Sequence, residues 1–344
     1  MPVDIIPFHE GLLPQAAELL ARRHARDRAA LPLLPARFET PRVAMSAVRD
    51  VWHRDWARGA AAMRDGRLLG YLIGEARFDT LRGRHAWVYL PGHALAETAP
   101  ADLYADLYAA VGPEWLRLGA FDHYILAPAN DAPSLAAWFS LSFGQEQCHA
   151  LRSLADPLPD APAMPDVRVR RATRTDRDAM VEEMSPLLQR HLAGSPIWGA
   201  ALPEYLSPVR EGFAEMVADD TVRVWLAETI APEPARSPGA GASRVLGYQA
   251  YYPAAPADDN PMVPERALLL EVAATLPEAR RQGIGRALTR AGLADAAAAG
   301  YTVCLADWRT TNLEAQRFWP RLGFQPAAYR LTRKVDPRIA WARG

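Results

Sequence analysis

The chain has 344 residues, of which half are hydrophobic and 23% charged, the proportions of a globular protein with room for two domain cores. Lys and Arg together number 39, and Asp and Glu together number 40. This balance leaves no positive excess to hold a nucleic acid or an anionic membrane surface.

The cysteines and the apolar runs exclude further classes. Cys148 and Cys304 are far apart and belong to no CxxC motif, which argues against a disulfide framework and a zinc site. The first residues, MPVDIIPFHEGLL, lack the basic and then apolar pattern of a signal peptide. No run approaches the ~20 apolar residues of a membrane span. We therefore expect a cytoplasmic protein, monomeric or homodimeric, with no metal, nucleic-acid or membrane partner.

A proline-rich segment divides the chain. Residues 154–166, LADPLPDAPAMPD, contain four prolines and predict a stiff, extended linker. We expect one domain at residues 1–153 and another at residues 167–344.

The two halves repeat each other. The pentapeptide RLLGY at 67–71 recurs as RVLGY at 244–248. A trio with spacings of 7 and 5 also recurs 181 residues later: Asp131, Trp138 and Phe143 in the first half, and Asn312, Trp319 and Phe324 in the second. Repetition over this distance indicates two domains of one fold rather than a solenoid.

In the second half, strands alternate with single helices. The patterns predict strands at 167–172, 221–228, 244–252, 267–276 and 302–308, and helices at 177–192, 203–217, from 284 to Gly300, and from a capping box of Thr311 and Glu314 to Gly323. Residues 230–243, IAPEPARSPGAGAS, predict a mobile loop. This order predicts an α/β fold, a mixed twisted sheet flanked by helices.

The segment EARRQGIGRAL, residues 278–288, joins the most apolar strand to a helix. A glycine turn at this place leaves backbone N–H groups free at the positive end of the helix, which suits a phosphate. Gly283 and Gly285 let a ligand approach the backbone, and Arg280 and Arg281 add charge-assisted donors. The alternative is a tight turn with exposed arginines.

Other phosphate loops have different patterns. A dinucleotide fingerprint needs a glycine where Leu288 stands, and no Gly-Lys-Ser/Thr of a P-loop follows. Together with NLEAQRFWPRLGF at 312–324, the segment resembles the GNAT superfamily of acyl-CoA N-acyltransferases over about residues 166–335. The doubled arrangement resembles tandem GNAT proteins, mycothiol synthase among them.

The resemblance implies acetyl-CoA or coenzyme A as the cofactor. The glycine segment would hold its pyrophosphate, and the preceding strand would give backbone donors to the pantetheine arm and the acyl carbonyl. The implied cofactor-binding residues are Val272, Ala274, Thr275, Leu276, Arg280, Arg281, Gln282, Gly283, Ile284, Gly285, Arg286, Asn312 and Trp319.

The catalytic groups depart from the family pattern. Glu271 is the only carboxylate within the apolar strand, and the resemblance implies a general base whose pKa burial would raise. It lies two residues later than the usual glutamate, which keeps the same strand face; the alternative is a glutamate in a salt bridge. The family's acidic tyrosine falls at Trp319, whose indole cannot supply a proton. Tyr301, Tyr329 and Cys304 are replacements by type only.

The first half lacks the phosphate loop. The register of the repeated trio places TAPADLY, residues 98–104, opposite the glycine segment, with Asp102 opposite Gly283. Asp102 would repel a pyrophosphate. We expect a degenerate GNAT-like domain without a cofactor site, unless the register is wrong.

The acceptor is the least defined part of the prediction. His191, Trp198 and Tyr205 would form an aromatic wall or pack in the core, and Asp258 and Asp259 would attract a cation or form a solvated loop. The sequence predicts an N-acetyltransferase that moves an acetyl group from acetyl-CoA to the amine of a small molecule. The alternative is a non-catalytic acyl-CoA-binding or scaffold protein.

Overall fold

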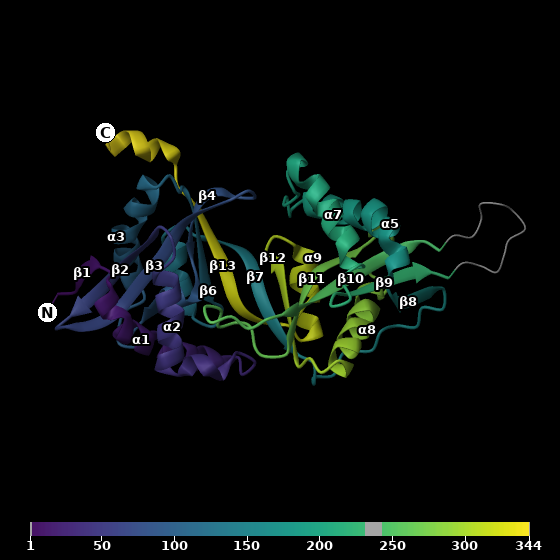
Figure 1. The fold of residues 1–344 in the computed structure, drawn as a ribbon, viewed down its shortest axis with the longest axis horizontal. Coiled ribbons are helices and arrows are strands. Elements are labelled where there is room, and N and C mark those ends of the chain that lie inside the picture. Colours follow the sequence, from purple (N-terminus) through teal and green to yellow (C-terminus); the bar gives the residue numbers. More distant parts are fainter. Residues whose placement is uncertain (1, 231–242, 344) are drawn as a thin grey trace, which may run out of the picture. The chain divides into compact units, whose positions relative to one another are not determined.

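The computed structural model describes residues 2–230 and 243–343 and forms two compact units (Figure 1). Unit 1 combines the chain up to Ala150 with Pro256–Glu265 and the segment from Gln325 onward, and unit 2 contains Leu151–Ala255 and Arg266–Phe324. The loop predicted at 230–243 lies almost wholly outside the described residues. In the described part of the chain, no helix is long and apolar enough to cross a membrane.

Unit 1 is a sheet with helices on both faces. Its strands are β1 (Asp4–Pro7), β2 (Ala57–Arg64), β3 (Arg67–Asp79), β4 (Gly83–Val88), β5 (His93–Leu95), β6 (Asp122–Pro128), β7 (Gly144–Ser153) and β13 (Gln325–Lys334). The order is β1-β2-β3-β4-β6-β13-β7, with β5 on β3. Its helices are α1 (Leu13–Ala30), α2 (Pro41–Trp52), α3 (Leu103–Arg117) and α4 (Ala132–Ser140). Alternate residues of β3 enter two cores: Leu72 packs with α3 and α4, and Tyr71 and Ile73 pack with α1 and α2.

The last strand of the chain completes the sheet of unit 1. β13 is antiparallel to β6, from Ala328 opposite Pro128 to Lys334 opposite Asp122, and Leu331 is fully buried in the unit 1 core (Figure 1). We had expected residues 167–344 to form one domain. The structure divides the chain differently, because β13 has its ladder partner and its core contacts in unit 1.

Unit 2 is a five-stranded mixed sheet. Its strands are β8 (Val167–Arg171), β9 (Arg223–Thr229), β10 (Val245–Ala254), β11 (Ala267–Thr275) and β12 (Val303–Arg309), in the order β12-β11-β10-β9-β8. Only β11 and β12 are parallel among these described pairs. Its helices are α5 (Arg177–Ala179), α6 (Ser185–Ala193), α7 (Leu206–Met216), α8 (Ile284–Ala298) and α9 (Leu313–Phe318), with a π-helical turn, Met180–Met184, joining α5 to α6. The expected mixed sheet flanked by helices is confirmed.

The repeated residues occupy matching places in the two units. Trp138 and Phe143 of unit 1 pack with ring centroids 5.4 Å apart and an interplanar angle of 75°. Trp319 and Phe324 of unit 2 pack at 5.4 Å and 74°. The repeat found in the sequence is therefore a repeat in structure.

The helices before these aromatic pairs also begin alike. The Asp131 side chain accepts a hydrogen bond from the Ser134 amide at 3.1 Å, and the Asn312 side chain accepts one from the Ala315 amide at 3.1 Å. Both side chains cap a helix by satisfying an amide of its first turn. The cap of α9 is Asn312 and not Thr311, which the capping-box pattern had indicated.

Candidate active site

Two parallel strands of unit 2 separate at Glu271. The register of β11 with β12 ends at Leu270 opposite Ala306, although both strands continue. On its other edge β11 pairs with β10 through a bulge, so that Val272 and Leu270 have partners and Glu271 between them has none in that register. A bulge bends a strand and re-aims its side chains, which accounts for the separation at this point.

The ladder with β10 decides which amides of β11 face the separation. The Leu276 N–H donates to the Leu246 carbonyl at 2.8 Å, so its amide is part of the β10 ladder. Because amides alternate between the two edges of a strand, those of Val272 and Ala274 point the same way. The resemblance had implied all three as cofactor-binding residues. The amides that face the separation belong instead to Ala273, which the sequence had not singled out, and to Thr275.

The glycine segment before α8 has the predicted geometry. Gly283 has φ +94° and is the N-cap residue of α8. This left-handed conformation suits glycine, and a Cβ there would lie 2.2 Å from Cγ of Pro162. At Gly285 a Cβ would lie 3.2 Å from the Phe318 ring. Ile284 is buried and anchors the start of α8. Because the helix begins here, the N–H groups of its first turn have no partners inside the helix.

Arg280 turns back along β11. Its Nε donates to the Thr275 carbonyl at 3.2 Å, Nη1 pairs with Glu314 at 3.0 Å, and Nη2 contacts Nδ1 of His191 at 3.2 Å. The alternative interpretation, a tight turn with exposed arginines, describes Arg281 but not Arg280. These three contacts fix Arg280 at the end of β11.

Two other residues of this segment, Gln282 and Arg286, donate hydrogen bonds to neighbouring backbone carbonyls. The Gln282 side chain donates to the Glu278 carbonyl at 2.9 Å, and Arg286 donates to the Asp160 carbonyl at 2.9 Å. Arg290, one turn further along α8, pairs with the Asp160 carboxylate at 2.7 Å.

The predicted linker therefore belongs to the site. Residues 155–166 contain no helix or strand, as expected, but Asp160 and Pro162 lie against the start of α8. Upstream, Arg152 donates to the carbonyls of Asp156 at 2.8 Å and Pro157 at 3.1 Å. This segment is held along its length instead of spanning freely.

His191 joins the two motifs of the resemblance. It lies in the last turn of α6, and its Nε2 lies 3.1 Å from the Asn312 side-chain nitrogen while Nδ1 faces Arg280. Burial, and then the positive charge of Arg280, lower the pKa of His191. Trp198 is exposed and Tyr205 is half-buried, so neither of these two aromatic residues packs in the core.

Glu271 faces a second carboxylate. The side chain reaches solvent, yet enough protein surrounds its carboxyl group that desolvation raises the pKa, and the negative charge of Asp307 on β12 raises it further. Within the described residues, no ion pair involves Glu271. This argues against the alternative in which Glu271 forms a salt bridge.

Trp319 is a packing residue. It is buried, with its ring 4.8 Å from that of Phe318 and 5.4 Å from that of Phe324. Among the alternatives by type, Cys304 is fully buried, and burial raises its thiol pKa to about 12. Tyr301 lies beside Arg223, with 5.7 Å between guanidinium and ring.

The matching region of unit 1 is filled by side chains. Asp102 precedes α3 as Gly283 precedes α8, but its φ is −66°. The fully buried His93 lies with Nε2 2.8 Å from the Leu126 carbonyl of β6 and Nδ1 2.9 Å from the Tyr104 hydroxyl. Burial lowers the pKa of His93 to about 3, so the ring is neutral. The imidazole thus bridges β5 and β6, the counterparts in unit 1 of the strands β11 and β12 that separate in unit 2.

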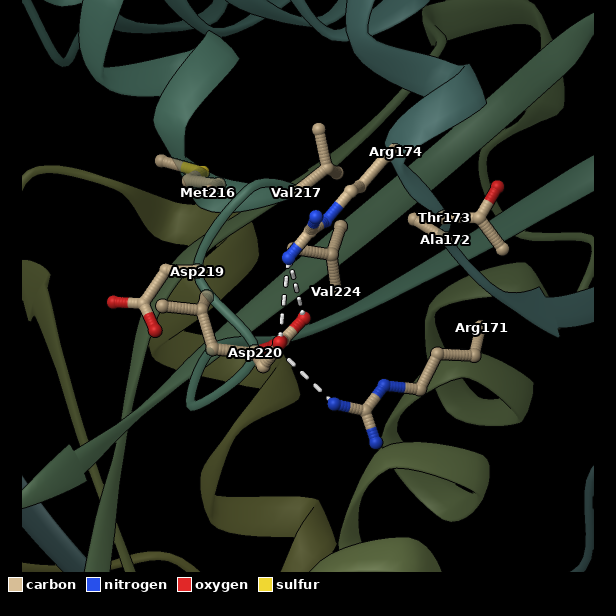
Figure 2. A pocket seen from close by; sticks show the side chains of 10 residues that line it. Arg171, Ala172, Thr173, Arg174, Met216, Val217, Asp219, Asp220 and Val224 are labelled. Atoms are coloured by element: carbon tan, nitrogen blue, oxygen red, sulfur yellow. Dashed lines mark hydrogen bonds and ion pairs between the residues drawn. The ribbon is translucent and has the colours of Figure 1, made fainter.

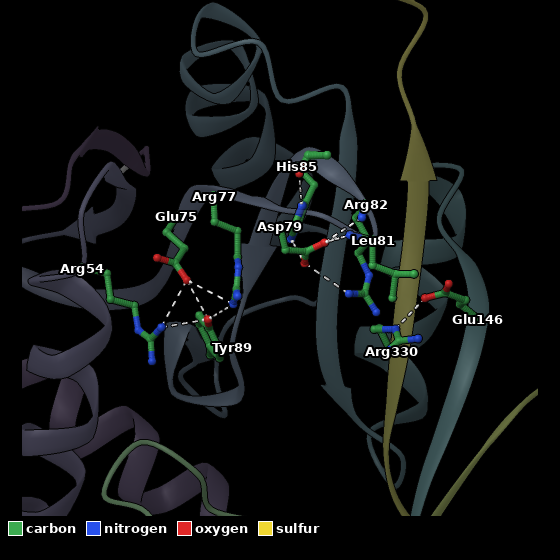
Figure 3. A network of polar contacts seen from close by, with 11 residues as sticks. Arg54, Glu75, Arg77, Asp79, Leu81, Arg82, His85, Tyr89, Glu146 and Arg330 are labelled. Carbon is green, nitrogen blue, oxygen red and sulfur yellow. Dashed lines mark hydrogen bonds and ion pairs between the residues drawn. The ribbon is translucent and has the colours of Figure 1, made fainter. Parts of the chain in front are cut away.

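Two further polar clusters lie in other parts of the described chain. In unit 1 the Tyr89 hydroxyl donates to Glu75 at 2.6 Å and accepts from Arg54 and Arg77, each at 2.8 Å (Figure 3). Arg54 also pairs with Asp259, and Arg37 pairs at 3.1 Å with Asp258, whose side chain stays largely exposed.

The second cluster lies in unit 2. It is a pocket of about 300 Å³ at the end of β8. Figure 2 shows Arg174 reaching across it to Asp220, at 3.3 Å. The pocket shares no residue with the loop or with the strand separation.

Comparison with known proteins identifies the class. Residues 223–326 match the acetyltransferase (GNAT) domain family Acetyltransf_7. A GCN5-related N-acetyltransferase from Sphaerobacter thermophilus is similar in structure, with a TM-score of 0.57 and 13% identity over 96% of this chain and 95% of that chain. The glucosamine N-acetyltransferase region of a fungal multi-domain GH3 β-N-acetylglucosaminidase gives 0.52 and 13%, over 96% of this chain and 38% of that one. A tandem GNAT protein from the clavulanic acid biosynthesis pathway gives 0.48 and 15%, over 98% and 99%.

The match places an acetyltransferase (GNAT) domain within residues 223–326, and the fold over 96% of the chain is similar to that of a GCN5-related N-acetyltransferase. The expected resemblance and the expectation of two tandem GNAT-like units are confirmed. No curated protein matches the sequence.

Proposed function

We propose that the protein is an acetyl-CoA-dependent N-acetyltransferase for small-molecule amines, with the cofactor bound by unit 2 alone. The observation that carries the proposal is that the glycine segment at the start of α8 follows directly after β11, the strand whose register with β12 ends at Leu270. An anion site and an open strand edge are what a ligand with a pyrophosphate and an amide-containing arm requires.

The residues of unit 2 fit such a ligand. Arg280, Arg281 and the free N–H groups after Gly283 would hold the pyrophosphate, and the amides of Ala273 and Thr275 face the place of the arm. When bound, acetyl-CoA supplies an acyl group activated as a thioester. In unit 1 the His93 side chain takes the corresponding place, which supports a single cofactor site.

The carboxylates favour an amine acceptor. Glu271 and Asp307 together attract an ammonium group. An amine attacks a carbonyl only as the neutral base, and a glutamate with a raised pKa is suited to take its proton. Glu271 is thus the proposed base, acting directly or through a water molecule.

Titration calorimetry with coenzyme A tests the cofactor site. We expect one molecule bound per chain. Gly283→Asp should abolish binding, with a loss of at least ~3 kcal/mol, because it places a Cβ and a negative charge at the loop. Asp102→Asn, at the matching place in unit 1, is the control and should bind normally. Two molecules per chain, or normal affinity in a folded Gly283→Asp variant, would contradict the proposal.

The packing of Trp319 favours one alternative, a protein that binds acyl-CoA without turnover. The two functions differ in one assay. The protein is mixed with acetyl-CoA, a panel of amines and a thiol-reactive dye. Release of coenzyme A that depends on an amine supports the transferase, whereas binding without release across the panel supports the alternative.

A further inference from the structure

The environment of His191 contains too many hydrogen-bond donors. Arg280 faces Nδ1 at 3.2 Å, and the Asn312 side-chain nitrogen faces Nε2 at 3.1 Å. A guanidinium group can only donate. The Asn312 amide is oriented by its capping role, because its oxygen accepts from the Ala315 N–H and its NH₂ group therefore faces His191.

A histidine ring cannot satisfy both neighbours. The neutral imidazole has one acceptor nitrogen and one N–H, and the protonated ring has no acceptor. One ring nitrogen therefore presents its N–H to another donor. The three side chains lack one acceptor, and a ligand that brings oxygen atoms would supply it.

Charge and position indicate which oxygens these are. The charged groups that face His191 are Arg280 from the loop and Glu314 from α9, and Arg280 already shares one nitrogen with Glu314. The first-turn N–H groups of α8 come shortly after Arg280 in the chain. A phosphate oxygen beside Arg280 would accept hydrogen bonds from a cation as well as from neutral donors. Its hydrogen bonds would therefore be stronger than those of an uncharged oxygen.

We propose that His191 is a positioning residue of the cofactor site, whose ring N–H donates to a pyrophosphate oxygen lying beside Arg280 and Asn312. This inference rests on the proposed function of unit 2. It adds a contact from α6, about 90 residues before the phosphate loop, to that site.

Proton linkage distinguishes this role from a structural one. In the free protein the pKa of His191 is lowered by burial and by Arg280. A bound pyrophosphate offsets the charge of Arg280 and raises this pKa. Binding then takes up a proton, so affinity increases as pH falls through the pKa of the bound state and levels off below that of the free state. Each unit of difference changes affinity about tenfold.

The test is calorimetric titration of the full chain with 3′-dephospho-coenzyme A between pH 5.5 and 8.5. This probe keeps the pyrophosphate but has no phosphomonoester that titrates in this range. His191→Phe removes the donor, and His191→Gln keeps an N–H donor that does not titrate. His53→Gln, an exposed histidine of unit 1 that contacts Glu10, is the control.

We expect His191→Phe to bind at least about tenfold more weakly at pH 7.5 and His191→Gln to bind within about threefold of the wild type. The wild type and the control should bind more tightly at low pH, and both His191 variants should lose that dependence. Pantetheine, which lacks the pyrophosphate, should bind all of them alike.

Three results would overturn the inference. They are unchanged affinity and pH dependence in His191→Phe, wild-type pH dependence in His191→Gln if the Phe variant fails to fold, and a loss of pantetheine affinity as large as that of the probe. A wild type that binds no coenzyme A refutes the proposed function as well. Normal wild-type binding with unaffected variants refutes the inference alone.

Discussion

Glu271 combines access to solvent with a raised pKa, because it stands in the bulge of β11 opposite the carboxylate of Asp307. A base must reach its substrate, and it must also hold a proton strongly enough to take one near neutral pH. The bulge leaves Glu271 without a partner on β10, and desolvation and the charge of Asp307 raise its pKa.

Replacing Glu271 by Gln keeps the shape and removes the base. We expect turnover to fall by ~10²–10⁴-fold with little change in coenzyme A affinity. The acid limb of the pH–rate profile should flatten, since the limb reports protonation of the carboxylate. The measurement is steady-state kinetics from pH 5 to 9. Wild-type rates with a wild-type profile would exclude Glu271 as the base.

Asp307→Asn removes the neighbouring negative charge, so the pKa of Glu271 should fall. The base then stays ionised to lower pH, and the acid limb should move toward acid. The KM for a cationic amine should rise roughly fivefold, from about 1 kcal/mol of lost attraction. The same pH series measures both effects, and an acid limb that stays in place would show that Asp307 does not act on Glu271.

At this scale the sequence was most informative where chemistry is local. Gly283 was identifiable because a positive φ depends on neighbours in the chain, and the start of α9 was placed one residue early, at Thr311 instead of Asn312. His191 was named only as a candidate for the acceptor wall, because its partners, Arg280 and Asn312, are 89 and 121 residues away. The amide of Ala273 was missed because the direction of a strand's amides depends on the register with β10.

Among the elements, α9 carries two functions on one side chain. Asn312 caps the helix through its oxygen and faces His191 through its nitrogen. Asn312→Asp should keep the cap and lose the donor, so that stability stays near that of the wild type while coenzyme A affinity falls. Asn312→Ala should also cost ~1 kcal/mol of stability.

Thermal unfolding and calorimetry measure the two effects separately. Asp131→Ala, at the matching cap of α4, is the control and should lose stability without a loss of affinity. Equal affinity in all three variants would show that the nitrogen of Asn312 has no role in binding.

At the scale of the whole molecule, β13 makes unit 1 depend on the end of the chain. Leu331→Ala should cost ~2–5 kcal/mol, because the side chain is fully buried in the unit 1 core. Lys334→Ala, exposed on the same strand, should change stability by less than ~0.5 kcal/mol. Proteolysis of Leu331→Ala, followed by mass spectrometry, should show new cuts within residues 2–150. Cuts confined to residues 167–324 would contradict the division of the chain described here.

The duplicated fold was predictable, since each half carries its own strand pattern and its own Trp–Phe pair. The membership of β13 was not, because it depends on the strand with which it pairs, and the antiparallel register with β6 assigns it to unit 1. The absence of the glycine segment from unit 1 was predicted from the sequence at 98–104, but the filling of this region by His93 was not. The imidazole itself lies on another segment.

The linker segment has a consequence for protein engineering. Flexible tethers tolerate changes of length, because each doubling costs only ~0.6 kcal/mol in closure entropy. This one is fastened by Arg152 near its start and by Arg286 and Arg290 at Asp160, and Pro162 lies on the glycine that begins α8. A Gly-Ser spacer inserted between residues 157 and 160 would therefore act as an insertion into unit 2, and fusions or circular permutants of this protein should be opened elsewhere.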